Sequence, residues 1–161
     1  MLRPETPPEG SPLPERIRAS LGRPDNPLFA RAKTLGLTLR IRDVIPSTRR
    51  AHECAEYARA HDKLQAFHRG VLERYWSHGE DIHDWAVLGA VATAVGLDAA
   101  QMQAEVDAGQ WRATTDAALA GAAQVGVRAV PTFLVADRIA LSGAQEAEVF
   151  RQAFARLATP E

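Results

Sequence analysis

Between residues 47 and 125, hydrophobic side chains recur every three or four positions along the chain. That spacing gathers them on one face of a helix and leaves polar residues on the other face. Good helix-starting residues precede three of the runs, namely Ser47, Asp84 and Asp98, and Gly79 and Gly96 each follow one. The pattern predicts an all-helical region with helices over about 48–60, 63–76, 85–95, 99–108 and 110–125.

The N-terminal part of the chain is rich in proline. Residues 1–14 hold five of the ten prolines, which fix φ and cannot donate backbone hydrogen bonds, so we expect an irregular arm there. A short helix is predicted over 13–21. Asn26-Pro27 is a typical helix start and predicts a second helix over 27–35. Residues 37–42 alternate between apolar and polar side chains, which predicts a short strand.

The character of the sequence changes after Gly126. Two short runs rich in strand-forming residues, 131–135 and 139–141, flank a turn at 136–138 and predict a β-hairpin. A final helix over 145–157 has five apolar residues that we expect to face inward: Ala147, Val149, Phe150, Phe154 and Leu157. A two-stranded hairpin is marginally stable by itself in water. The region is therefore typical of a fold in which part of the sheet is missing.

These patterns divide the chain into three parts. We expect an N-terminal arm with connecting helices over 1–46, an inserted all-helical domain over 47–125, and a C-terminal hairpin and helix over 126–161. The predicted fold class is α/β with mostly helix. The 161 residues are 46% hydrophobic and 24% charged, a composition typical of an ordinary globular protein.

Charge and hydropathy argue against two classes of partner. The net charge of −1 provides no basic field for nucleic acid. No apolar run approaches the roughly 18 residues that a membrane-spanning helix needs. Residues 1–10 are polar, acidic and rich in proline, unlike a secretory signal peptide, so the expected location is the cytoplasm.

Cys54 is the single cysteine of the chain, so the chain alone cannot form an internal disulfide or cycle as a dithiol. It lies on the alanine-rich face of the predicted helix over 48–60, where a buried, unreactive thiol is favoured over a reactive one. No pair of histidines has the spacing of a zinc site. These histidines are His52, His61, His68, His78 and His83. We therefore expect no metal and no cofactor.

Residues 126–133 read Gly-Val-Arg-Ala-Val-Pro-Thr-Phe, and the predicted hairpin and Ser-Gly-Ala-Gln at 142–145 follow them. This segment resembles the cis-proline hairpin of the DsbA family of thioredoxin-like proteins. Other segments resemble the FrnE-like branch of that family; they lie at 2–10, 48–53, 66–69, 79–82 and 87–88. The resemblance implies an incomplete thioredoxin-like fold with an inserted helical domain.

The resemblance also implies a binding site. It implies that the Val130–Pro131 bond is cis and that Val130 presents its backbone to a polypeptide, so Val130, Pro131 and Thr132 are the expected substrate-binding residues, with protein or peptide thiols as substrates. Pro131 alone would equally suit a trans proline opening a strand, since cis occurs in about 5–6% of such bonds. Only the flanking pattern favours cis.

The family's Cys-x-x-Cys motif, with its helix and two strands, would precede Leu2 and is not in this chain. No catalytic residue is therefore carried over, and three functions stay open. The first is an oxidoreductase of this family that is redox-inactive as this chain stands, and the second is a non-catalytic peptide-binding or assembly module. The third, less favoured, is a glutathione-dependent isomerase or transferase. Because the apolar residues of the hairpin need cover, we also expect a homo-oligomer.

Overall fold

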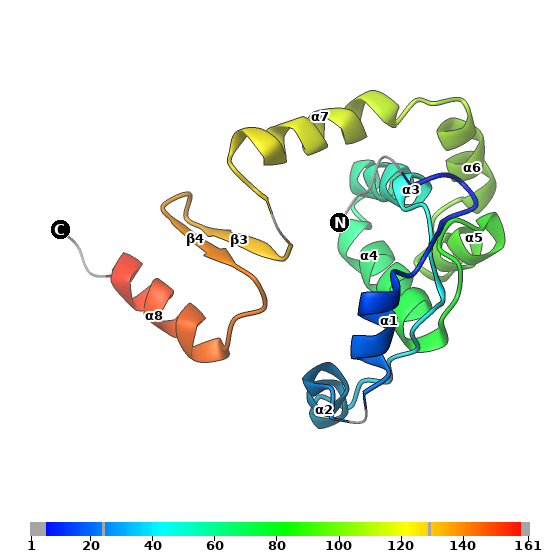
Figure 1. Ribbon diagram of the computed structural model, residues 1–161. Coiled ribbons are helices and arrows are strands. Elements are labelled where there is room, and N and C mark those ends of the chain that lie inside the picture. The colour runs from blue at the N-terminus through cyan, green and yellow to red at the C-terminus, as the bar shows by residue number, and fades with distance from the viewer. Residues whose placement is uncertain (1–5, 24, 129, 159–161) are drawn as a thin grey trace. The chain divides into compact units, whose positions relative to one another are not determined.

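The main core of the protein lies among four consecutive helices. In the computed structural model, which describes residues 6–23, 25–128 and 130–158, these are α3 (Arg49–Ala60), α4 (Leu64–Glu73), α5 (Trp85–Ala94) and α6 (Ala99–Asp107). Figure 1 shows them as one bundle in which α3 contacts the other three. The largest fully buried side chains belong to these helices: Tyr57, Phe67, Leu88, Met102 and Cys54. The helical period of the sequence places all five on inward faces.

Helix starts follow the predicted capping residues in most cases. The Asp84 carboxylate accepts a hydrogen bond from the N–H of Ala86, and Asp98 accepts one from Gln101, each at 2.9 Å. The predicted Ser47 cap is wrong. The N-cap of α3 is Thr48, whose φ of −101° and ψ of −3° depart from the extended backbone typical of a cap, and its side chain makes no capping hydrogen bond.

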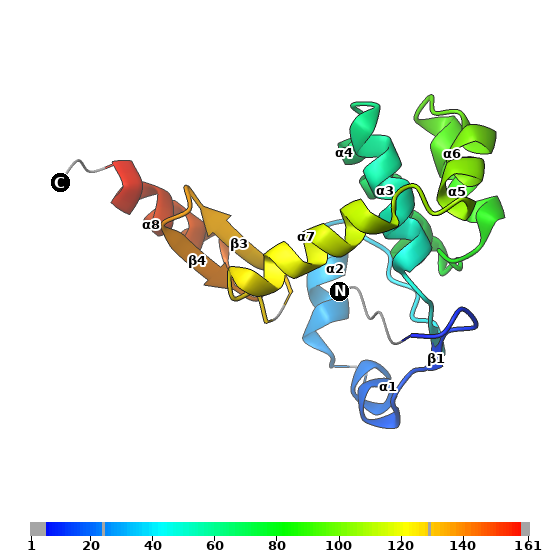
Figure 2. The same cartoon turned by 90° about the horizontal axis from the view of Figure 1, so that it is seen from above.

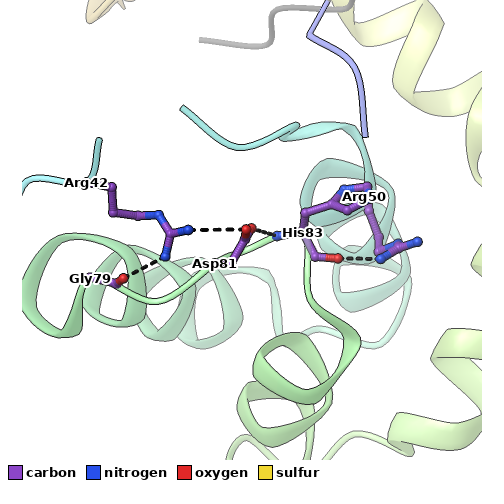
Figure 3. A network of polar contacts seen from close by, with 5 residues as sticks. All are labelled: Arg42, Arg50, Gly79, Asp81 and His83. Atoms are coloured by element: carbon purple, nitrogen blue, oxygen red, sulfur yellow. Dashed lines mark hydrogen bonds and ion pairs between the residues drawn. The ribbon is translucent and has the colours of Figure 1, made fainter. Parts of the chain in front are cut away.

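The predicted strand over 37–42 is also wrong, because this segment is an irregular connection. The Arg40 N–H donates to the Trp76 carbonyl at 2.7 Å. In Figure 3 the Arg42 guanidinium donates to the Gly79 carbonyl at 2.7 Å and to the Asp81 carboxylate at 3.3 Å. The segment is thus held by the end of a helix rather than by strand pairing. That helix is η1 (Arg74–His78), a π-helical turn that continues α4.

The N-terminal residues form a small sheet that the sequence did not predict. β1 (Ser11–Pro12) pairs antiparallel with β2 (Val44–Ile45), and α1 (Glu15–Leu21) and α2 (Pro27–Thr34) lie between them in the chain. Strands of two residues are too short to show a period of two, so the hydrophobic pattern carries no signal for them. The two helices match the predicted ones closely.

The chain divides into two compact units, with the boundary between Asp116 and Ala117 inside α7 (Arg112–Gln124). The second unit holds the predicted hairpin, β3 (Thr132–Val135) paired antiparallel with β4 (Ile139–Ser142), and then α8 (Ala147–Ala158). Figure 2 shows α8 lying along the hairpin. The division at 46/47 and 125/126 stays a prediction. None of the described helices has the length and hydrophobicity to cross a membrane.

The second unit has a thin core. From Ala117 to Ala158, with residue 129 outside the description, Ala153 is the one buried residue. Phe133 and Phe150 meet edge to face at 4.9 Å between ring centroids. Phe154, predicted to face inward, is 56% exposed. The apolar face that the sequence predicts for α8 is wider than the surface that the two-stranded sheet covers.

Cys54 lies inside the helical core with no exposed surface. Burial raises the pKa of its thiol to about 12, against 9.0 for an ordinary cysteine. The thiol is therefore neutral near pH 7 and belongs to the packing of α3, as the sequence predicts.

This pKa predicts how stability depends on pH. Between pH 9 and pH 12 the unfolded chain releases the Cys54 proton while the folded chain keeps it, so the free energy of unfolding falls as pH rises through that range and is unaffected below it. At about pH 10.5 the loss is about 2 kcal/mol. Urea unfolding at pH 8 and pH 10.5 should show a loss about 2 kcal/mol larger in the native protein than in Cys54→Ala, because the raised pKa values of Tyr57 and Tyr75 affect both proteins alike. An equal loss in both would contradict the prediction.

Candidate functional site

The loop that precedes β3 is positioned from both sides. On one side α7 ends in a Schellman motif, in which Gly126 has φ +78° and the Val127 N–H donates to the Ala122 carbonyl at 3.0 Å. On the other side the Gly143 N–H donates to the Pro131 carbonyl at 2.8 Å. That bond lies just beyond the last residue pair of the ladder, so it ties the entry to β3 to the end of β4.

Within this loop the Val130–Pro131 peptide bond is cis. Val130 is 55% exposed, and neither its N–H nor its carbonyl makes a hydrogen bond with any described residue. Among the described strands, β3 pairs with β4 alone. Val130 therefore lies just before a strand that is paired along one edge among the described strands. Its backbone N–H and carbonyl are both without a described partner.

The two faces of the hairpin differ in their cover. Phe133, Val135, Ile139 and Leu141 share one face, since directly opposed residues point the same way, and Phe150 of α8 packs on it. Thr132, Leu134, Ala140 and Ser142 share the other face. On that face Leu134 is 47% exposed. This side of the small sheet is thus open, with Leu134 as its large exposed apolar residue between Thr132 and the exposed Ala140 and Ser142.

The loop carries no group that could do thiol chemistry. The chain has no cysteine or histidine after residue 116, and Cys54 is buried in the other unit with its pKa raised to about 12. The described residues also bring together no cluster of three or more histidine, cysteine, aspartate or glutamate side chains that could hold a metal ion. The chemical groups that Val130 presents are a backbone N–H that can donate a hydrogen bond and a carbonyl that can accept one.

The histidines serve packing and helix ends. The His61 ring bonds to the Tyr57 carbonyl at 2.8 Å and stacks on the Tyr57 ring. His78 lies 3.8 Å from the Glu73 carboxylate. Burial lowers the pKa of His52 to about 4, so it is neutral near pH 7.

Two features escaped the sequence analysis. The first is the bond from Gly143 to Pro131, which could not be foreseen because it depends on the hairpin register. The second is a cavity of about 340 Å³ at the start of α3, lined in part by Arg49, Arg50 and Arg112. The sequence shows Arg49 and Arg50 side by side at a predicted helix start, which was a signal for a positively charged site. It gives no sign that Arg112, which is distant in sequence, lines the same cavity.

Comparisons with known proteins agree with this architecture. A family model described as DSBA-like thioredoxin domain matches residues 4–155. The fold is similar to the crystal structure of a probable DsbA oxidoreductase from Streptomyces coelicolor, with a TM-score of 0.75 and 29% identity, over 91% of this chain and 64% of that one. The sequence is 27% identical over 125 residues to the uncharacterized protein YwbO of Bacillus subtilis (strain 168), covering 76% of this chain and 62% of that protein. The chain thus spans less than two thirds of the length of each relative.

The matched range contains the helical bundle, the loop at Val130 and the hairpin. The resemblance seen at residues 126–133 is therefore confirmed at the level of the family. The chain belongs to the DSBA-like thioredoxin domain family and has its thioredoxin-like, mostly helical fold.

Proposed function

We propose that this chain binds an extended polypeptide at the loop of Val130, Pro131 and Thr132, as the substrate-binding part of a DsbA-like thiol-disulfide oxidoreductase. The observation that carries the proposal is the exposed Val130, whose backbone N–H and carbonyl make no hydrogen bond with described residues. An extended peptide that adds to a strand edge uses such groups, and backbone pairing supplies affinity with little dependence on sequence. That suits an enzyme that accepts many protein substrates.

The chemistry of disulfide exchange sets the limit of what this chain does alone. Exchange begins when a thiolate attacks a disulfide sulfur, and the thiolates that do this have lowered pKa values and solvent access. Cys54 has neither property, since it is buried with its pKa raised to about 12. The reacting cysteines of the proposed oxidoreductase are therefore not supplied by this chain, which by itself is redox-inactive.

A second role, in assembly, is favoured by the open face of the hairpin. Leu134 and Phe154 are 47% and 56% exposed in a unit whose one buried described residue is Ala153. Apolar surface of this kind is stabilised when another chain covers it. We propose that the chain alone associates with itself through the hairpin.

The peptide proposal predicts binding that depends on backbone groups. An octapeptide selected on a peptide array should shift the amide resonances of Val130 and Thr132 in the ¹⁵N NMR spectrum of the intact chain. The same peptide, N-methylated at alternate amides, should bind about 2- to 10-fold more weakly for each hydrogen bond it loses. Val130→Ala should bind within about twofold of the native chain, because it keeps the backbone groups. Binding that ignores N-methylation, or shifts confined to other segments, would show that the loop is not the site.

The redox proposal predicts that the isolated chain gives no catalysis. At pH 7 a thiol with a pKa of about 12 is ionised in about one molecule in 10⁵, too few to compete with free dithiol. Reduction of insulin by dithiothreitol should proceed at the same rate with the native chain, with Cys54→Ala and with no added protein. A faster rate with the native chain that Cys54→Ala abolishes would overturn the assignment of Cys54 as inert.

The assembly proposal predicts concentration-dependent association. Sedimentation velocity should show species larger than the monomer, and Leu134→Lys should weaken association at least about tenfold, since burying a leucine contributes about 1.5–3 kcal/mol. Leu35→Lys is the matched control, because Leu35 is 65% exposed and lies in the other unit. A chain that stays monomeric at high concentration, or two variants with equal effects, would refute the role of the hairpin.

A further inference from the structure

A cavity of about 340 Å³ opens at the first turn of α3, within the helical unit and apart from the loop at Val130. Its walls come from the N-terminal arm, α3, the segment before α5, the end of α6 and the start of α7. The polar residues that line it include Ser47, Arg49, Arg50, His83, Asp107 and Arg112. Nothing in the proposed polypeptide binding uses this cavity.

The backbone at this end of α3 has donors with no acceptor. The N–H groups of Arg49, Arg50 and Ala51 have no backbone partner among the described residues, and no side chain caps the helix. Together with the helix dipole of a 12-residue helix, they favour negative charge at this position. A helix start alone does not make a binding site. Whether this one can bind an anion depends on the side chains around it.

The Nδ1 atom of the His83 ring is fully buried and has no hydrogen-bond partner. Ser47 also lines the cavity and is 7% exposed, and its hydroxyl, which is not one of the fully buried atoms, makes no hydrogen bond with any described residue. Because an unsatisfied buried polar atom costs about 1–3 kcal/mol, such groups usually have a partner, here one that the cavity could admit.

The three arginines of the cavity differ in what they already bind. Arg49 is paired with two carboxylates, its guanidinium lying 3.3 Å from Glu53 and 2.6 Å from Asp116. The Arg50 guanidinium donates to the His83 carbonyl, as Figure 3 shows, and lies 4.6 Å from the Trp85 ring centroid. These contacts hold Arg50 in place and leave most of its donors unused.

Arg112 is the cation with no partner here. It forms no ion pair or hydrogen bond through its side chain with any described residue, although it lines the cavity. The carboxylates that line the same cavity are Glu53 and Asp107. Glu53 is paired with Arg49, and Asp107 and Arg112 are both exposed with no ion pair between them, so neither carboxylate neutralises Arg112.

We propose that this cavity binds a small molecule through an oxyanion, either a carboxylate or a phosphate group. The oxyanion would accept hydrogen bonds from Arg112, Arg50 and Ser47 and from the first-turn N–H groups of α3. The planar guanidinium fork matches both kinds of oxyanion, and helix starts bind both. A cavity of about 340 Å³ exceeds the size of the anionic group and leaves room for the rest of a small molecule.

The test is a titration of the ¹⁵N-labelled intact chain with inorganic phosphate and, separately, with acetate, each at constant ionic strength set with sodium chloride. At least one anion should give saturable shifts of the Arg49, Arg50 and Ala51 amides, with a dissociation constant of about 1 mM or below. The anion that binds more tightly identifies the group that the natural ligand carries. Shifts that stay linear in both titrations would overturn the proposal.

Variants separate a specific site from general charge effects. Arg112→Gln should weaken binding at least about tenfold, and Ser47→Ala about threefold or more, since hydrogen bonds to charged groups are the stronger ones. Arg16→Gln is the matched control, because Arg16 is an exposed arginine of α1 with no ion pair to a described residue, and it should bind within about twofold of the native chain. Equal weakening by Arg112→Gln and Arg16→Gln would show mere surface attraction and refute the site. Peptide binding at Val130 should be unchanged in Arg112→Gln, so the two proposals fail independently.

Discussion

A β-strand satisfies its backbone hydrogen bonds through neighbouring strands, and β3 has one such neighbour among the described residues. Most features of the C-terminal unit depend on this constraint. With two strands, the sheet covers part of α8 through Phe133 and Phe150 and leaves Phe154 and Leu134 largely exposed. Just before β3, the backbone N–H and carbonyl of Val130 make no hydrogen bond with any described residue. The unit therefore has a strand edge with no partner among the described strands, and this is the edge at which we propose that a polypeptide or another chain pairs.

The backbone of the helical unit, in contrast to that of β3, is paired mainly within its own elements. Its four central helices pair the backbone groups of their interiors within each helix and close a core around Tyr57, Phe67 and Leu88, while the first-turn N–H groups of α3 have no backbone partner among the described residues. Cys54 is part of that core, where burial suppresses the thiolate that exchange chemistry needs. The chain therefore belongs to the DSBA-like thioredoxin domain family and has exposed backbone groups at Val130 but no reactive thiol. The cavity proposed to bind an oxyanion is lined entirely by residues of this unit.

The sequence predicted those helices and strands whose signals lie in residues close together along the chain. Asp84 and Asp98 begin helices because their carboxylates reach the next turn, and the hairpin formed where strand-rich runs flank a turn. The segment 37–42 has the alternation of a strand, yet its backbone is held by Trp76 and its Arg42 by Gly79 and Asp81, contacts that only the tertiary fold brings together. The loop residues were found through family resemblance rather than through periodicity. The Gly143 bond and the position of Arg112 depend on register and packing, which a single sequence does not display.

The account rests on the claim that the Val130 backbone is a binding surface rather than a loop that happens to be exposed. Amide hydrogen exchange at Val130 tests this most directly. In the free chain this N–H has no acceptor among the described residues, so it should exchange at a rate near that of an unstructured peptide. With a saturating extended octapeptide, the account predicts that exchange at Val130 slows by at least about tenfold while the amides of the helical core are unchanged. Unchanged exchange at Val130 with the peptide fully bound would contradict it.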